Sequence, residues 1–484
     1  MEFSTPFFLF IFFPIFILIY TISHNHYKKW LILIASLVLY AWFQRTNFLI
    51  VGVLILLNYL LLILFWKIRT PNLFHKSIFI FTICFNILFL LFFKIFTTTN
   101  WIHTFIDTEF PNFTFIQSVT FPIGLSFIIF QIISCLIDTQ NDIANAPQHF
   151  ASYANYLFMF PKILVGPITR FNKVNSQLES LNTSLEMIAK GSRRFIIGLS
   201  KKILIADQLA IMVNAGFNLP VPAYPTSIAW TILIGYFLQI YYDFSGYIDM
   251  GLGIATMLGL SLPENFNRPY ASRSLTEFWR GWHMTLLSWF RDYVFYPLEF
   301  KRRGETFLRR ETNTVIVFLL TGLWHGITLN YILWGFIQGL IISFENSRFG
   351  KWIKKIPSIF QRMYLIFIIL MSWVIFRSPN MGFALRFFKR LFIIDQSVQL
   401  YPFSLTKPLP IINNSVILIL ILGIVCLLPL NEWWKNISAK LFFPAFTGSW
   451  VSQSLFDFGY LILLVASICV LAGQNFVPSI YGGF

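Results

Sequence analysis

The chain has 484 residues, of which 57% are hydrophobic and only 12% are charged, and its net charge is +16. Soluble domains carry about 25% charged residues, so this composition excludes a soluble globular protein and indicates a polytopic membrane protein. Surplus positive charge suggests nucleic-acid binding in a soluble chain, but here the basic residues gather in short loops between apolar segments, at 26–30, 67–76, 192–202, 301–310, 351–355 and 386–390. This distribution is typical of cytoplasmic loops, and we expect no nucleic-acid partner.

Apolar segments of near-spanning length recur along the chain. The first, residues 3–22, follows Glu2 and precedes Lys28 and Lys29. Because a secretory signal begins with a basic region, we expect an uncleaved anchor with its N-terminus outside the cytoplasm. The other segments are at 30–42, 47–66, 77–96, 118–137, 192–215, 226–242, 248–262, 313–324, 329–345, 363–376, 415–430 and 457–473. Several are shorter than the roughly 20 residues of a straight span, which predicts re-entrant or broken helices that protein covers.

Loop charge predicts the sidedness of the connections. Residues 97–117 contain Asp107 and Glu109 but neither Lys nor Arg, and we expect them to be external. The basic loops 67–76 and 301–311 are expected to be cytoplasmic.

The sequence predicts a single membrane domain over residues 1–484, because neither an internal repeat nor a Pro/Gly/Ser-rich linker divides it. Within this domain we distinguish a motif-bearing region at about 118–345 and C-terminal helices at 363–484. The cysteines lie singly inside apolar segments and are interpreted as small apolar residues rather than disulfide partners or metal ligands: Cys84, Cys135, Cys426 and Cys469.

Polar residues inside the membrane domain concentrate between residues 240 and 340, and such residues are functional candidates. The run YYDFSGYIDMGLG brings Asp243, Ser245 and Asp249 into an apolar region. The two carboxylates either form ion pairs with nearby arginines or contribute to a site.

Residues 262–298 are amphipathic and rich in aromatic side chains, and they suit a helix that enters the membrane obliquely from the cytoplasmic side. On one helix Trp279 and Arg280 share a face with His283. The aromatic density, including Trp282, fits either an interfacial belt or the lining of a ligand tunnel. Arg280 fits either phosphate binding or ordinary cytoplasmic positive charge.

Histidine usage singles out two residues. From residue 150 onward the only histidines in the sequence are His283 and His325, and both lie in the polar stretch between residues 240 and 340. The helix from Thr312, beside the basic loop, to His325 would be roughly 20 Å long in a hydrocarbon core about 30 Å thick. A neutral imidazole at that depth can act as a general base. The structural alternative is a hydrogen-bonded residue that joins two helices.

Five stretches resemble the membrane-bound O-acyltransferase family, and more narrowly its bacterial alginate O-acetyltransferase branch, which is related to the D-alanyltransferase of teichoic acid. They are FPIGLSFIIFQ (121–131), FPKILVGPITRF (160–171), GLSKKILIADQLA (198–210), the long run from YYDFSGYID to FRDYVFYPL (241–298) and LTGLWHGITLNYILWG (320–335). These stretches are long and occur in order, which makes the resemblance far more specific than a lone short motif.

The resemblance implies an all-α polytopic fold, in which a ring of about 11–13 tilted transmembrane and re-entrant helices surrounds a central tunnel. It places the catalytic histidine of the WHG motif at His325 and the second family histidine at His283. We expect the substrate tunnel to involve Trp324, Trp279, Trp282, Arg280, Asp243, Ser245 and Asn330.

The implied activity is transfer of an acyl group, expected to be acetyl, from a cytoplasmic thioester to hydroxyls of a cell-envelope polysaccharide. The donor, acetyl-CoA or an acyl-carrier thioester, would be a substrate rather than a tightly bound cofactor, and no metal is expected. Partners would be the lipid bilayer, the cytoplasmic donor and a periplasmic or extracellular acyltransferase or polysaccharide-biosynthesis protein. The implied location is the bacterial inner membrane.

Three alternatives stay open. The first is D-alanyl or other short-acyl transfer from a carrier protein to teichoic acid or peptidoglycan. The second is a proton-coupled transporter that uses Asp243, Asp249 and the histidines, and the third is a catalytically inactive scaffold. One departure from the family pattern lies near the site, where Gln338-Gly339 stands in place of the His-Gly of many relatives. Others lie at Glu299-Phe300-Lys301-Arg302 and in the C-terminal SIYGGF.

Overall fold

The computed structural model of the chain describes residues 3–68, 73–98, 120–142, 145–164, 166–219, 221, 225–300, 307–348, 350–393, 412–427 and 450–473. Within these ranges every regular element is a helix, and the sole β-type pairing is an isolated bridge between Phe266 and Trp282. Four of the described helices are long and apolar enough to span a membrane, at Arg45–Lys67, Leu73–Phe96, Ser358–Arg377 and Ser454–Ala472. The prediction of an all-α polytopic membrane protein is confirmed.

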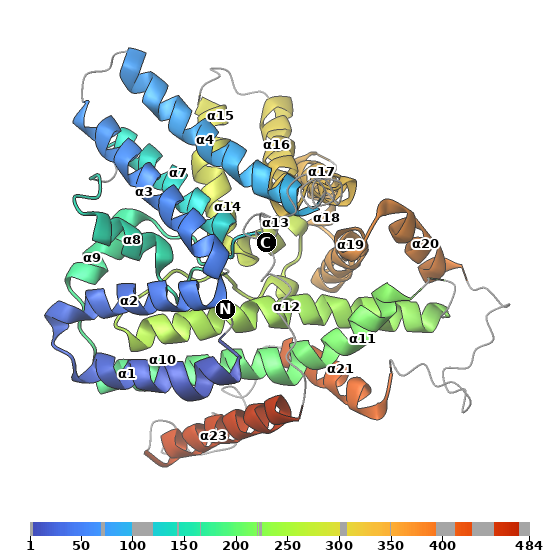
Figure 1. The fold of residues 1–484 in the computed structure, drawn as a ribbon. Coiled ribbons are helices and arrows are strands. Elements are labelled where there is room, and N and C mark those ends of the chain that lie inside the picture. Colours follow the sequence, from blue (N-terminus) through green and yellow to red (C-terminus); the bar gives the residue numbers. More distant parts are fainter. Residues whose placement is uncertain are drawn as a thin grey trace, which may run out of the picture.

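Two long antiparallel rods form the centre of the molecule (Figure 1). One rod is α12 (Thr226–Met257), and the other runs through α10 (Leu185–Ser200), η2 (Lys201–Ala206) and α11 (Asp207–Asn218). Most of the 32 residues of α12 are buried. The central rods therefore provide the core against which the other helices pack.

Glycines let the backbones of α10 and α12 touch. A Cβ on Gly198 would lie 2.5 Å from the carbonyl oxygen of Gly246, and a Cβ on Gly191 would lie 2.5 Å from that of Gly253. No side chain fits at such separations, so the spacing of the two rods depends on residues without a Cβ.

The predicted division of 226–242 from 248–262 is wrong, because one helix spans Thr226–Met257. Ion pairs accommodate the polar residues that suggested a break. The Asp243 carboxylate lies 2.9 Å from Lys202 Nζ, and that of Asp249 lies 2.7 Å from Lys201 Nζ. These partners come from the neighbouring rod, which the local sequence pattern does not reveal.

The N-terminal helices form one side of the molecule, coloured blue to teal in Figure 1. Asn58 and Asn86 join α3 to α4 through two amide hydrogen bonds of 3.2 and 2.6 Å. The group consists of η1 (Phe8–Phe12), α1 (Phe13–Ile22), α2 (Asn25–Phe43), α3 (Arg45–Lys67), α4 (Leu73–Thr98), α7 (Leu125–Gln140), α8 (Phe150–Phe158) and α9 (Phe171–Glu179). The short helices α8 and α9 were not predicted from the sequence.

The remaining helices pack around the rods and complete the site. A short irregular series comes first, with η4 (Pro269–Ala271), α13 (Leu275–Gly281), α14 (Met284–Phe290), η5 (Arg291–Phe295) and α15 (Tyr296–Phe300). Longer helices follow, with α16 (Phe307–His325), α17 (Leu329–Asn346), α18 (Gly350–Ile353), α19 (Ser358–Arg377), α20 (Met381–Phe392), α21 (Asn414–Leu427) and α23 (Trp450–Ala472). Helix α23 lies along α10, where Ser467 and Ser200 hydroxyls are 3.2 Å apart.

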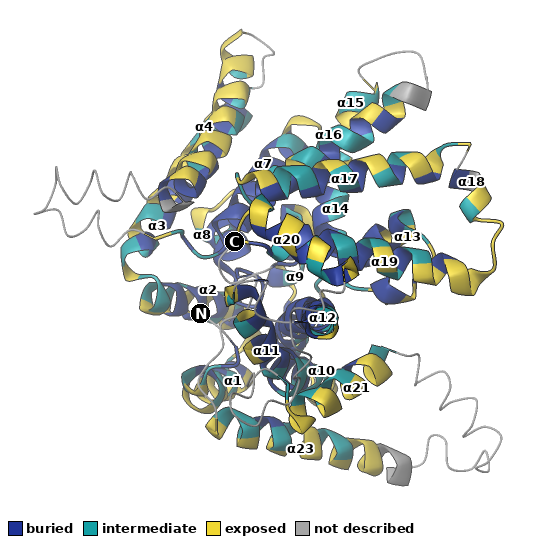
Figure 2. Ribbon diagram, turned by 90° about the vertical axis from the view of Figure 1, so that its right-hand side faces the viewer, coloured by how far each residue is buried: buried dark blue, intermediate teal, exposed yellow. Residues whose placement is uncertain are grey.

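Outer helices expose apolar side chains, as lipid-facing helices do. Figure 2 shows extensive exposed surface on α4 and α23. Residues 69–72, 99–119 and 301–306 lie outside the described residues. The predicted sidedness of the loops at 67–76, 97–117 and 301–311, and of the N-terminus, therefore stays a prediction.

Candidate active site

The first half of the site is the turn between α16 and α17. Helix α16 ends at His325, and Gly326 carries the chain past the Tyr331 ring, whose Cδ2 would lie 2.4 Å from an added Cβ. Below the turn, Gly322 and Gly335 bring the two helices into backbone contact, since a Cβ on Gly322 would lie 2.3 Å from the Tyr331 carbonyl oxygen. The small residues of the motif thus hold His325 at the end of a closely packed helix pair.

The second half is the break between α13 and α14. The backbone of Asn267 donates to the Gly281 carbonyl at 2.9 Å, and that of Met284 donates to the Asn265 carbonyl at 3.0 Å. This pairing draws residues 281–284 out of a helical path, so the prediction that Trp279 and His283 share a face of one helix is wrong.

His283 lies in this break with a left-handed backbone, at φ 47° and ψ 50°. Non-glycine residues adopt this conformation rarely, and it costs of the order of 1–3 kcal/mol. The conformation is fixed from outside, because the Asn265 side-chain oxygen accepts from both the backbone and the hydroxyl of Thr285, at 3.0 and 2.6 Å.

Both imidazoles contact the indole of Trp324. Its ring centroid lies 6.0 Å from that of His283 and 4.7 Å from that of His325. The side chains are buried, with 2% of His283 and 7% of His325 exposed. Residues from the two halves of the site, 42 positions apart in the chain, thus meet at one aromatic ring.

Aromatic side chains enclose the two histidines. Phe244 of α12 and Phe127 of α7 lie 4.8 and 6.2 Å from the His283 ring centroid. Trp334 of α17 and Phe376 of α19 lie 5.3 and 5.0 Å from that of His325. An aromatic enclosure of this kind limits the access of water to the two imidazoles.

Within the described part of the chain, neither ring nitrogen of His283 has a hydrogen-bond partner, and the same holds for the indole nitrogen of Trp324. Buried polar atoms are nearly always hydrogen-bonded, and exceptions call for an explanation. A bound substrate that carries oxygen or sulfur atoms would supply partners for them. The described residues contain no cluster of three or more His, Cys, Asp or Glu that could hold a metal ion.

The expected tunnel tryptophans lie inside the protein rather than in an interfacial belt. The Trp279 indole donates to the Gln338 side chain at 3.1 Å, and its ring lies 5.7 Å from that of Trp334. Trp282 is 2% exposed and lies 5.6 Å from Trp373. The two tryptophans extend the aromatic wall behind His325, and Gln338 forms part of that wall.

Three other expected site residues, Arg280, Asp243 and Asn330, meet solvent or partners other than the histidines. Arg280 is exposed, and Asp243 is engaged by Lys202. Asn330 donates to the backbone carbonyls of Ile375 and Ser378, which ties α17 to the end of α19. Ser245 is buried, and its hydroxyl has no hydrogen-bond partner among the described residues.

Lys94 is a site residue that the sequence analysis missed. It is 6% exposed, and its ammonium donates to the backbone carbonyl of Trp324. The sequence does mark this residue, because Lys94 is the only charged residue from 77 to 98 and lies inside an apolar segment. A buried cation at the C-terminal end of α16 satisfies a carbonyl that the helix leaves unpaired and is favoured by the helix dipole.

A cavity of about 300 Å³ lies beside α14 and is lined in part by Thr285, Ser288, Arg170 and Lys173. Thr285 is two residues from His283, so the cavity borders the segment that carries this histidine. The exposed Lys173 offers this cavity a cationic group suited to a phosphorylated ligand.

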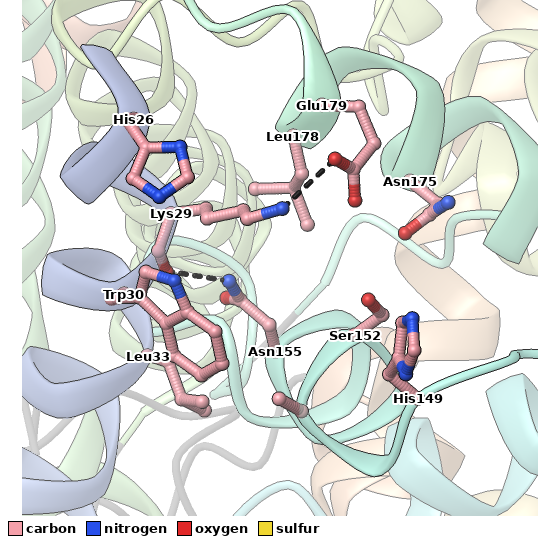
Figure 3. Close-up of a pocket in the computed structure, with 11 residues that line it drawn as sticks. His26, Lys29, Trp30, Leu33, His149, Ser152, Asn155, Asn175, Leu178 and Glu179 are labelled. Carbon is pink, nitrogen blue, oxygen red and sulfur yellow. Dashed lines mark hydrogen bonds and ion pairs between the residues drawn. The ribbon is translucent and has the colours of Figure 1, made fainter.

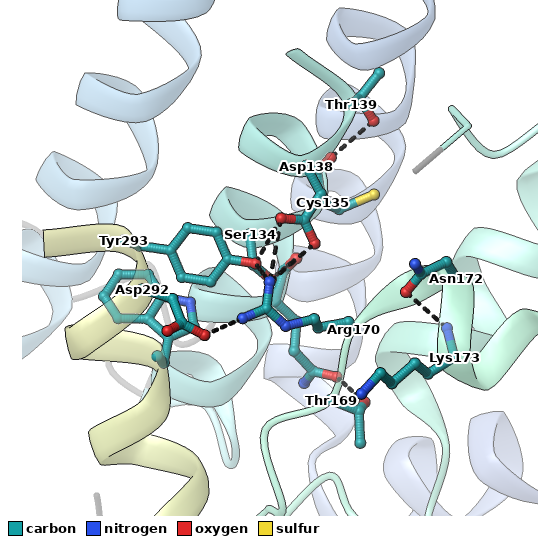
Figure 4. Close-up of polar contacts among 12 residues, drawn as sticks. Ser134, Cys135, Asp138, Thr139, Thr169, Arg170, Asn172, Lys173, Asp292 and Tyr293 are labelled. Atoms are coloured by element: carbon teal, nitrogen blue, oxygen red, sulfur yellow. Dashed lines mark hydrogen bonds and ion pairs between the residues drawn. The ribbon is translucent and has the colours of Figure 1, made fainter. Parts of the chain in front are cut away.

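Arg170 also fixes the wall of this cavity (Figure 4). Its guanidinium donates to Tyr293 at 2.6 Å and to Asp138 at 3.3 Å, and it pairs with Asp292. These contacts join α7 to η5, so a partly buried ionic network orients the α14–η5 segment.

Comparison with known proteins places these features in a family. The family model described as "MBOAT, membrane-bound O-acyltransferase family" matches residues 60–383. The chain is 33% identical over 393 residues to a probable alginate O-acetylase, AlgI, of Pseudomonas aeruginosa, covering 81% of this chain and 75% of that protein. It is 32% identical over 435 residues to a peptidoglycan O-acetyltransferase of Helicobacter pylori, covering 80% and 79%. A teichoic acid D-alanyltransferase of Bacillus subtilis is 28% identical over 246 residues, covering 48% and 60%.

Proposed function

Since the chain belongs to the membrane-bound O-acyltransferase family, we propose that it transfers an acetyl group from a cytoplasmic thioester to hydroxyls of a cell-envelope polysaccharide. The acceptor side of this proposal is supported by the relatives, which are named for alginate, peptidoglycan and teichoic acid. The acetyl group is favoured because the O-acetylating relatives align with about 80% of the chain, against 48% for the D-alanyltransferase.

The observation that carries the proposal is the pair of buried histidines on one indole ring. His283 and His325 both contact Trp324 inside an aromatic enclosure. Two nitrogen bases in a space shielded from water suit a reaction in which a hydroxyl must lose a proton and a thioester must not meet water.

We assign His325 as the general base. Its imidazole takes the proton of the acceptor hydroxyl as the oxygen attacks the thioester carbonyl carbon. The carbon–sulfur bond then breaks, the proton passes to the departing sulfur, and an ester and a free thiol leave the neutral imidazole behind. Positioned bases contribute about 10²–10⁴-fold to such reactions.

We assign His283 to the donor. Its neighbour Thr285 borders the cavity that is lined by the exposed Lys173, where a phosphate group of a coenzyme A or carrier-bound thioester would find a cationic partner. The unpartnered nitrogens of His283 would then contact the acyl group. A periplasmic protein that receives or delivers the acetyl group, and residence in the bacterial inner membrane, belong to the same proposal.

The substitution His325→Gln tests the proposal, because glutamine keeps hydrogen-bonding capacity but cannot accept the proton. We expect acetyl transfer by purified, lipid-reconstituted protein to fall by about 10²–10⁴-fold, measured as thiol release from acetyl-CoA in the presence of polysaccharide acceptors. The exposed His24, changed in the same way, is the matched control and should keep full activity.

Near-parental transfer by folded His325→Gln would remove the general-base role. If the parent releases thiol from a D-alanyl carrier-protein thioester but not from acetyl-CoA, the alternative of D-alanyl transfer is correct. The parent's failure with both donors would contradict the proposed reaction.

A further inference from the structure

A second cavity, of about 390 Å³, lies between α2, α8 and α9 and includes neither His283 nor His325. Its volume falls in the range of small-molecule sites. Lys29 and Trp30 come from α2, Asn155 from α8, and Asn175 and Glu179 from α9 (Figure 3).

The cavity presents hydrogen-bond acceptors that the described part of the chain leaves unfilled. Asn155 is 4% exposed, and its amide nitrogen donates to the Lys29 carbonyl at 2.8 Å. That bond fixes the amide orientation, so the side-chain oxygen of Asn155 is an acceptor without a partner among the described residues. The buried side-chain oxygen of Asn175 is in the same position. These two oxygens can accept hydrogen bonds from a ligand that carries N–H or O–H donors.

Charges of both signs line the same cavity. The Glu179 carboxylate lies 2.8 Å from the Lys29 ammonium, and the two side chains are 51% and 30% exposed. Exposed ion pairs are weak. Lys29 can therefore exchange Glu179 for an anionic group of a ligand, and Glu179 can exchange Lys29 for a cationic group. His26 and His149 add two imidazoles, each with an N–H group that can donate a hydrogen bond.

An apolar stripe leads away from the cavity along α2. Trp30, Ile34 and Val38 are 44%, 55% and 53% exposed, and their spacing of four residues places them on one face of the helix. Exposed tryptophan beside lysine at a helix end is typical of the membrane–water interface. The stripe suits acyl chains, and the cavity is at the end of the stripe where a headgroup would lie.

We infer that this cavity binds a phosphoethanolamine group, supplied by a membrane phospholipid. A primary ammonium has three N–H donors, and the oxygens of Asn155, Asn175 and Glu179 provide three acceptors. The phosphate accepts from Lys29 and the imidazoles. A choline headgroup has no N–H donor and leaves the amide oxygens unfilled, so the site discriminates between the two lipids.

Native mass spectrometry of the full-length protein, extracted from mixed phosphatidylethanolamine, phosphatidylcholine and phosphatidylglycerol, tests the inference. We expect at least tenfold preferential retention of phosphatidylethanolamine. Glu179→Gln and Asn175→Leu should each reduce this preference at least threefold while the protein stays folded. Glu186→Gln, on an exposed glutamate of α10, is the matched control and should leave it unchanged.

Equal retention of the ethanolamine and choline lipids, or a preference for phosphatidylglycerol, would overturn the inference. Soluble glycerophosphoethanolamine gives the second arm. If it displaces the retained lipid only at millimolar concentration, the lipid is the ligand. If it binds as tightly as the lipid in detergent without lipid, the chemistry holds and the lipid source is wrong. None of these readouts depends on acyl transfer, so the inference stands or fails separately from the proposed reaction.

Discussion

At the residue scale, position 283 has two separate requirements, one for its backbone and one for its side chain. The position needs a left-handed backbone, at φ 47°, and the proposed reaction needs an imidazole. Asparagine tolerates the left-handed region better than other side chains. A substitution by asparagine therefore keeps the backbone conformation and removes only the imidazole.

We therefore expect His283→Asn to keep the unfolding temperature of the parent protein and to transfer at least tenfold less acetyl. His283→Ala should lose activity and should also lose about 1 kcal/mol of stability. Thermal unfolding in detergent and thiol release measure the two effects. Full activity in both variants would remove His283 from the site.

Lys94 gives a second prediction at this scale. Methionine preserves the length of the side chain but leaves the Trp324 carbonyl without its charged donor, and hydrogen bonds to charged groups contribute about 1.5–3 kcal/mol. We expect Lys94→Met to lower kcat about 10–100-fold, with little change in the KM for donor, because the cavity beside α14 is untouched. Lys67→Met, at an exposed lysine on α3, is the control. A variant with normal kcat would show that Lys94 only stabilises the fold.

These residues also show what the sequence can reveal about a site. His283 and His325 were identifiable because they are the only histidines beyond residue 150 and lie in recognisable motifs. Lys94 meets Trp324 across 230 positions, a contact for which no local pattern exists. Asp243 was expected near the tunnel, but its buried partner Lys202 lies on another helix and could not be inferred from spacing.

At the element scale, apolar length predicted the long helices well. The predicted segments 30–42, 47–66 and 77–96 correspond to α2, α3 and α4 within a few residues. Prediction failed where contacts between distant segments override the local pattern. Helix α12 continues through Asp243 and Asp249, which form ion pairs with the neighbouring rod. The pairing of Asn265 and Asn267 with residues 281–284 interrupts the expected helix. The length rule also overlooks α8 and α9, with nine residues each, because it searches for spans.

The contact between α10 and α12 gives a prediction at this scale. Gly198→Ala places a Cβ 2.5 Å from the Gly246 carbonyl oxygen, which forces the rods apart and should destabilise the protein by about 1–3 kcal/mol. Gly52→Ala is the matched control, since an added Cβ on α3 meets nothing within 4 Å and gains about 1 kcal/mol of helix propensity. Thermal unfolding in one detergent compares them. Equal unfolding temperatures would show that the rods do not depend on this close approach.

At the scale of the whole molecule, charge and architecture together predict how the protein lies in the membrane. The starts of α4 and α16 both lie at the upper edge of the molecule in Figures 1 and 2. Each helix begins inside one of the basic segments, 67–76 or 301–311. Helix α4 has 26 residues and a length of roughly 39 Å, which is enough to cross a hydrocarbon core about 30 Å thick. Its far end leads into the loop 97–117, which contains acidic residues and no Lys or Arg.

We therefore expect the loop at 97–117 to be external and the loop at 301–311 to be cytoplasmic. Single cysteines at positions 108 and 306, in a chain whose own four cysteines are changed to alanine, test this in intact cells. A membrane-impermeant maleimide should label position 108 at once and position 306 only after permeabilisation. The proposed reaction also requires the cavity with Arg170 and Lys173 to open toward the cytoplasm, where the thioester donor is. A third single cysteine, at Lys173, should therefore be labelled only after permeabilisation, like position 306. Labelling of Lys173→Cys from outside would reverse the proposed path of the acetyl group, while leaving the roles of His283 and His325 to be judged by their own variants.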